Sequence, residues 1–173
     1  MRLLPALGVL LAVAAGLAQK PTGPRAKSGK LPVVSLGPLA APKVSTQREG
    51  PKQVGRHRLL PKNSLRKGRW TSMPDGEPVW RLAIRSPGAQ GIRIHFQAFD
   101  LGSGKVWICP GDTAVGSPAG PYSSKGPNQD GEFWSDVVFG AEVVIEFRPV
   151  NRRAAGTLPS FRMPEISHLF EKM

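Results

Sequence analysis

Short runs in which apolar and polar residues alternate, separated by glycine, proline, aspartate and asparagine, dominate the chain from Gly68 to Pro149. A two-residue period is typical of strands that bury one face and expose the other. All four tryptophans, all seven phenylalanines and the single tyrosine lie in residues 70–173. This spacing predicts an all-β domain over residues 68–150, a single small antiparallel β-sandwich of the jelly-roll type.

Six strands are expected in this domain. Their ranges are 68–72, 79–85, 92–98, 105–109, 133–139 and 142–148. A long polar loop, residues 110–131, separates the fourth strand from the fifth. The alternation of apolar and polar residues ends after Pro149. Residues 151–173 are therefore expected to form a C-terminal tail with a short helical turn through Ile166, Leu169 and Phe170. A sandwich of about 80 residues buries a modest fraction of its surface. We therefore expect it to be stabilised by packing against this tail, a partner or a neighbouring domain.

Two of these strands flank a Ser-Pro-Gly turn in the segment RLAIRSPGAQGIRIHF, residues 81–96. If the loop 86–90 closes a hairpin with Arg85 opposite Gly91, large apolar side chains pair across the strands on one face. The pairs would be Trp80–Phe96, Leu82–Ile94 and Ile84–Ile92. Alternatively, the loop arches from one sheet to the other, and the two strands face each other across the core.

Residues 1–18 have the layout of a secretory signal peptide. Arg2 precedes an apolar run from Leu3 to about Ala15, and small residues follow before Gln19. The run is shorter than the ~20 apolar residues that a membrane span needs. We therefore expect an exported protein, periplasmic or extracellular, with no transmembrane segment after cleavage.

Positive charge is concentrated directly after this segment. Residues 19–69 carry a net charge of +12, whereas residues 70–173 carry −1. Such a basic stretch could bind a cell-surface polyanion or an acidic polysaccharide. The absence of aromatic residues in it disfavours specific nucleic-acid binding, which commonly uses base stacking.

The same stretch is rich in proline and has no sustained periodicity. It cannot bury enough apolar surface to compensate for the entropy lost on ordering. We expect residues 19–67 to form a basic, Pro-rich disordered linker, with room for a short strand at Val33-Val34 and a helical turn near Leu59-Leu60.

The sequence contains no recognisable catalytic motif. Nucleophilic catalysis needs a serine or cysteine, a base and an orienting acid, and the scattered histidines His57, His95 and His168 have no such surroundings. We therefore expect no enzymatic activity; a hydrolase would need His95 beside an acid and a nucleophile in one pocket. The single cysteine, Cys109, allows no internal disulfide, and we expect a buried apolar side chain rather than a reactive thiol.

Two sets of residues are candidate sites. Oxygen ligands at nearby positions in a loop suit calcium, although an ordinary polar turn before a strand has the same composition. The candidate calcium ligands are Asn128, Asp130, Glu132 and Asp136. No other cofactor is expected. The candidate recognition residues are a polar stripe on the strands and two aromatic side chains, namely Arg81, Arg85, Arg93, His95, Trp107 and Tyr122.

Three sequence segments carry a resemblance to a known family: DGEPVWRLAIRSPGAQGIRIHFQAFDLGSGKVWI, GPYSSKGPNQDGEFWSDVVFGAEVVIEF and FRMPEISHLF. Together, over residues 68–170, they resemble the region that precedes the catalytic domain in secreted bacterial trypsin-like serine proteases of the lysyl-endopeptidase type. The resemblance implies a non-catalytic β-sandwich accessory domain or pro-domain that mediates docking or recognition, with a protease domain as its partner.

The chain departs from these proteases because it lacks a Thr-Ala-Ala-His-Cys segment and a Gly-Asp-Ser-Gly-Gly segment. No catalytic residue is carried over, and one interpretation is a fragment of a serine endopeptidase. The alternative function is a carbohydrate- or polyanion-binding module at the cell surface.

Overall fold

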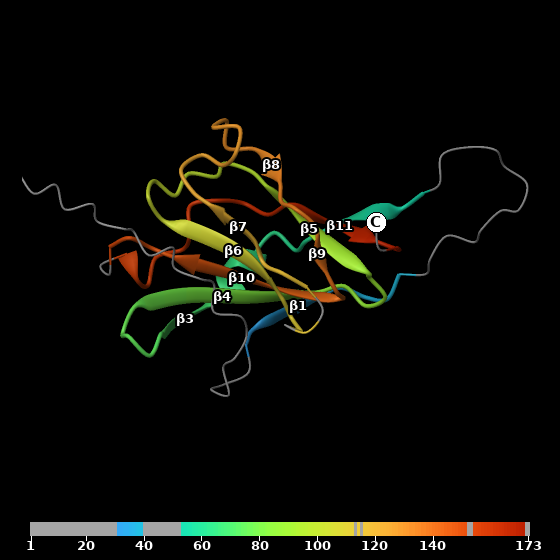
Figure 1. Cartoon of the computed structure of the whole chain (residues 1–173), viewed down its shortest axis with the longest axis horizontal. Coiled ribbons are helices and arrows are strands. Elements are labelled where there is room, and N and C mark those ends of the chain that lie inside the picture. Colours follow the sequence, from blue (N-terminus) through green and yellow to red (C-terminus); the bar gives the residue numbers. More distant parts are fainter. Residues whose placement is uncertain (1–30, 40–52, 113, 115, 152–153, 172–173) are drawn as a thin grey trace, which may run out of the picture.

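The computed structural model describes residues 31–39, 53–112, 114, 116–151 and 154–171. Within these residues the chain forms eleven strands and one short 3-10 helix, η1, and the strands build two sheets (Figure 1). The expected all-β class is therefore confirmed. The elements are β1 (Val33–Ser35), β2 (Gly55–Leu59), η1 (Ser64–Lys67), β3 (Arg69–Ser72), β4 (Pro78–Arg85), β5 (Gly91–Phe96), β6 (Lys105–Pro110), β7 (Ala119–Tyr122), β8 (Phe133–Trp134), β9 (Val138–Phe139), β10 (Glu142–Arg148) and β11 (Glu165–Leu169). No helix in the described ranges is long and apolar enough to cross a lipid bilayer.

The first sheet has the order β1-β4-β10-β6-β7, and β3 also pairs with β4. Its centre is β10, where Ile145 lies opposite Leu82 of β4 on one side and Ile108 of β6 on the other. All three side chains are fully buried. The pairings are antiparallel except that of β1, which runs parallel to β4 and places Val34 beside Ile84.

The second sheet has the order β2-β11-β5-β8, and β9 also pairs with β5. Its centre is formed by β11 and β5, which are antiparallel and place Ile166 opposite Ile94. On its other edge β11 pairs with β2, so the last described strand lies between β2 and β5 in the sheet.

The hydrophobic core lies between the two sheets and takes alternate side chains from both. Leu82 and Ile84 come from the first sheet, whereas Ile92, Ile94 and Phe96 come from the second, and all belong to one buried cluster. β4 and β5 therefore lie in different sheets and face each other across the core. The hairpin alternative is wrong, and the arch over residues 86–90 is the observed arrangement.

Segments outside residues 68–150 contribute to both sheets. The disordered linker expected over residues 19–67 is wrong for β1, β2 and η1, and the expected tail at 151–173 contains β11 instead of a helical turn. The short strand at Val33-Val34 is confirmed, whereas Leu59 ends a strand and the helical turn lies later, at η1. The expected signal peptide and residues 19–30 and 40–52 lie outside the described residues.

The cause of these corrections is the pattern in the two missed strands. β2 has the sequence GRHRL, which carries basic residues on both faces because it is an edge strand with little to bury. In β11 the residues that point inward are Ile166 and His168, so a histidine occupies a core position and hides the two-residue period. Two smaller differences are that β7 lies within the expected loop 110–131 and that the expected strand 133–139 is divided into β8 and β9.

Packing of β1 against the core can be tested with two adjacent valines. Val34 is 2% exposed and belongs to the core cluster, whereas Val33 is 38% exposed. We expect Val34→Ala to lower the free energy of unfolding by about 1–2 kcal/mol, because two buried methyl groups are lost. The matched control Val33→Ala should change it by less than about 0.5 kcal/mol in the same urea titration. Equal effects of the two substitutions would show that β1 is not packed in this way.

Candidate recognition face

The outer face of the second sheet gathers polar and aromatic side chains from four strands. On β5, Arg93 and His95 alternate with the fully buried Ile92, Ile94 and Phe96, so they point away from the core. The pairing of β5 with β8 places His95 beside Trp134, and the pairing of β11 with β2 brings in Glu165 and His57. We call the set Arg93, His95, Trp134, Glu165, His57 and Glu132 the recognition face.

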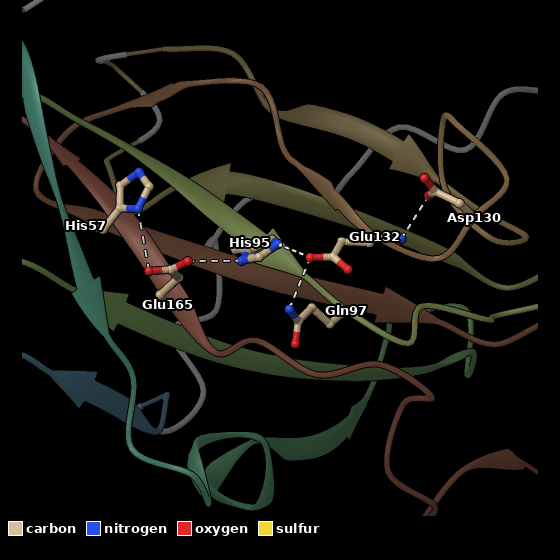
Figure 2. A network of polar contacts seen from close by, with 6 residues as sticks. All are labelled: His57, His95, Gln97, Asp130, Glu132 and Glu165. Carbon is tan, nitrogen blue, oxygen red and sulfur yellow. Dashed lines mark hydrogen bonds and ion pairs between the residues drawn. The ribbon is translucent and has the colours of Figure 1, made fainter.

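A chain of polar contacts runs across this face (Figure 2). The Nδ1 atom of His95 lies 3.1 Å from Oε1 of Glu165, and its Nε2 atom lies 3.1 Å from Oε1 of Glu132. The other oxygen of Glu165, Oε2, lies 3.6 Å from Nδ1 of His57. Gln97 donates from Nε2 to Oε1 of Glu132 at 3.1 Å. An imidazole ring with both nitrogens facing carboxylates is fixed in orientation, since a rotation would break both contacts.

Aromatic stacking also restrains the side chains of His95 and His57, since both rings contact Trp134. The rings of His95 and Trp134 are stacked, with centroids 4.7 Å apart and planes 10° apart, and the ring of His57 lies 4.8 Å from Trp134. The guanidinium of Arg93 lies 5.9 Å from the Trp134 ring, and its Nε donates to the carbonyl of Ser135. The result is a preorganised patch in which tryptophan and arginine, residue types that commonly anchor protein interfaces, lie beside histidine and carboxylate.

Both ring nitrogens of His95 are in contact with carboxylates. Among the described residues, therefore, no serine, threonine or cysteine is bonded to it. Ser135, the hydroxyl that follows Trp134 in the chain, is buried and donates to the carbonyl of Asp136 while accepting from the backbone N–H of Ile94. Of the groups that the hydrolase alternative requires, the described residues place an acid and a base at His95.

A second histidine contact lies inside the fold. The Oγ atom of Ser86 lies 2.7 Å from Nδ1 of His168, and Arg58 donates from Nη1 to the same Oγ at 2.8 Å. Ser86 and His168 are fully buried, and Nε2 of His168 has no hydrogen-bond partner within the described part of the chain. Burial, followed by the charge of Arg58, lowers the pKa of His168. This buried hydrogen bond joins β11 to the arch over residues 86–90.

The expected recognition residues do not form one stripe. Arg81 and Arg85 lie on β4 of the first sheet, whereas Arg93 and His95 lie on β5 of the second. Arg81 is buried, and its Nε and Nη2 each lie 3.0 Å from Oε2 of the fully buried Glu146. Arg85 is exposed and forms an ion pair with Glu142 at 2.6 Å.

The two aromatic candidates are mainly packing residues. Trp107 is buried on the outer side of the first sheet, and the guanidinium of Arg148 lies 5.1 Å from its ring. The hydroxyl of Tyr122 donates to Oδ2 of Asp136 at 3.0 Å and accepts from the backbone N–H of the same residue. Burial raises the pKa of Tyr122 to about 12, so this hydroxyl is neutral.

The structure does not gather the four candidate calcium ligands. The carboxylate of Asp136 is bonded to Tyr122, and Oδ1 of Asp130 accepts from the backbone N–H of Glu132, while the Glu132 side chain faces His95. In the described ranges, no group of three or more histidine, cysteine or acidic side chains is placed to hold a metal ion. The contacts are those of ordinary turns.

Cys109 is fully buried on β6, beside Ala83, Trp107 and Val144. Burial and, to a smaller extent, the charge of Glu146 raise the pKa of its thiol to about 12. The expectation of a buried apolar side chain is therefore confirmed, and the thiol is protonated at neutral pH.

Arg93 and His95 were among the candidate recognition residues of the sequence, whereas the residues around them were not. His57 and Glu165 lie in the stretches taken as linker and tail, so their strands were not expected to meet β5. The available signal was the alternation of Glu165 and Ser167 with Ile166 and His168, which marks a strand with one polar face.

Comparison with protein-family models identifies a related family. Residues 30–170 match the family model described as the lysyl endopeptidase N-terminal domain. The matched range includes every strand of both sheets, from β1 to β11. No solved structure matches the chain.

The buried Ser86–His168 pair predicts a pH-dependent stability. Because the pKa of His168 is lower in the folded protein than its ordinary value of 6.5, the unfolded chain binds the proton first as the pH falls. We expect the free energy of unfolding to decrease between about pH 7 and pH 5. The variant His168→Asn should be less stable at pH 8 but should show a flatter dependence over this range in urea titrations.

The matched control for this experiment is His57→Asn, since the side chain of His57 is mostly exposed. It should retain most of the slope of the unmodified protein. A His168→Asn protein with an unchanged slope would contradict the assignment of the pH dependence to this residue.

Proposed function

The chain belongs to the lysyl endopeptidase N-terminal domain family, and we propose that it is a secreted, non-catalytic accessory domain or pro-domain that docks against a protease domain. The single observation that carries this proposal is the family match, which extends over residues 30–170 and both sheets. The matched family describes the N-terminal domain of such proteases and not the domain that carries out peptide hydrolysis.

The recognition face is the surface that best suits docking. Its tryptophan contacts two imidazole rings and an arginine, so little side-chain entropy remains to be lost on binding. Its histidines and glutamates present both hydrogen-bond donors and acceptors at the surface. A rigid aromatic centre surrounded by polar groups is the usual composition of a protein–protein contact.

The first test measures binding of the full chain to the purified catalytic domain of a lysyl-endopeptidase-type serine protease by titration calorimetry. We expect saturable binding, and Trp134→Ala should weaken it by about tenfold because the stacked centre of the face is removed. Arg85→Ala is the matched control, since Arg85 is exposed on the other sheet. It should leave the affinity unchanged.

The same samples test the non-catalytic part of the proposal. The chain alone should not hydrolyse lysyl or arginyl ester substrates above the rate of buffer. The docking proposal fails if the unmodified chain does not bind the protease domain, and the non-catalytic assignment fails if purified chain hydrolyses the esters.

Export is supported by the layout of residues 1–18, in which a basic residue, an apolar run and small residues follow one another. Expression of the full chain in a Gram-negative host should place the protein in the periplasm or the medium. N-terminal sequencing of that protein is expected to begin at Gln19. Recovery only from the cytoplasm, with residues 1–18 still attached, would contradict export.

A further inference from the structure

An apolar groove lies at the end of the second sheet, next to the recognition face. Its walls are formed by η1 with the residues before it and by the segment that leads into β11. The apolar side chains along it are Leu59, Leu60, Leu65, Leu158, Phe161 and Met163. Gln97 also lines the groove, and its amide bonds to Glu132, so the groove and the recognition face meet at this residue.

The floor of the groove is part of the core and is therefore rigid. Phe161 is buried, and its ring lies 5.2 Å from that of Phe96 and 5.6 Å from that of Phe99. Met163 and Leu60 are buried in the same cluster. Such a floor keeps its shape without a ligand, which lowers the cost of ordering on binding.

Two leucines at the groove are exposed although the floor beneath them is buried. Leu59 is 77% exposed and Leu158 is 45% exposed, and both are among the few large apolar side chains that the described part of the chain leaves exposed. Clustered apolar exposure over a concave surface commonly marks a site where another protein binds. Each leucine offers apolar surface that a partner side chain would cover.

Unpaired positive charge surrounds this apolar surface. Lys62, Arg66 and Arg162 line the groove and are exposed, and their side chains make no ion pair or hydrogen bond to any described residue. The groove lining contains no aspartate or glutamate. Arg81 and Arg85 of the first sheet are paired with Glu146 and Glu142, whereas the groove combines exposed apolar side chains with cations that no described carboxylate neutralises.

We propose that this groove binds a segment of the partner protein in which apolar side chains are flanked by carboxylates. The inference rests on the proposed docking function and specifies the chemistry of the partner's contact. Apolar residues of the segment cover Leu59 and Leu158 against the floor at Phe161, and its carboxylates pair with the three cations at the rim. Charge complementarity of this kind sets orientation and association rate, while the apolar contact supplies most of the affinity.

The experiment uses the full chain and two groove variants. One variant, Leu59→Ser with Leu158→Ser, removes exposed apolar surface. The other, Lys62→Glu with Arg66→Glu, reverses rim charge. The matched control is Val150→Ser with Lys105→Glu, which makes one apolar-to-serine change and one charge reversal at exposed residues of another hollow. All proteins are first compared by thermal unfolding, and groove variants that unfold at the temperature of the unmodified chain are used for binding.

Three probes are titrated into these proteins. They are the catalytic domain of a lysyl-endopeptidase-type protease, a synthetic peptide of alternating leucine and glutamate, and the same peptide with lysine in place of glutamate. We expect each groove variant to bind the first two probes about tenfold more weakly than the unmodified chain, while the control binds normally. The lysine peptide should not bind.

The outcomes with the three probes distinguish failure of the groove inference from failure of the docking proposal. If the protease domain binds the unmodified chain and both groove variants equally well, docking stands and the groove inference is overturned. If the protease domain does not bind at all, docking fails, and the peptides alone decide the groove: groove-dependent binding of the glutamate peptide supports it, and absence of such binding overturns it.

A polyanion is the remaining occupant that the rim charges could hold. Salt-sensitive retention on heparin that is lost with Lys62→Glu and Arg66→Glu but not with the leucine variant, together with no binding of the glutamate peptide, would assign the groove to polyanions. That result would overturn a protein segment as its occupant.

Discussion

The pairing of β11 with both β2 and β5 holds the second sheet together. β2 lies near the start of the described fold and β11 near its end, so this sheet closes only when distant parts of the chain have met. Pairing across a long sequence separation must offset a large loss of chain entropy before its contacts form. The fully buried Ile166 and His168 supply the inward contacts of β11, and the Ser86–His168 bond ties it to the arch between the two sheets.

The surface chemistry depends on the same pairing. His57, Glu165 and His95 come from three strands, β2, β11 and β5, and the face exists only when these lie side by side in this register. A slip of one residue in β11 would turn Glu165 toward the core and Ile166 toward solvent. Recognition and folding are thus linked through one strand, because the residues that expose functional groups alternate with those that fill the core.

Alternation predicted the strands that bury large side chains and failed where an edge strand or a buried polar residue interrupts the pattern. β4, β5, β6 and β10 were predicted close to their observed bounds because Leu82, Ile94, Ile108 and Ile145 mark their inner faces. β2 was missed because its arginines give no inner face. The choice between hairpin and arch at residues 86–90 depends on which strands compete for the edges of β4, and that competition is a property of the whole fold. Two of the six residues of the recognition face, His57 and Glu165, could not be predicted from the sequence, since they reach His95 only through tertiary pairing.

The division of one side of β4 between two short strands affects self-association. β3 covers the first half of that side and β1 covers the second half, one antiparallel and the other parallel. Neither is longer than four residues, so neither offers a long row of free N–H and C=O groups to a second molecule. Short, interrupted borders of this kind resist the stacking of copies into fibrils. At this border, contacts with other molecules are therefore left to side chains.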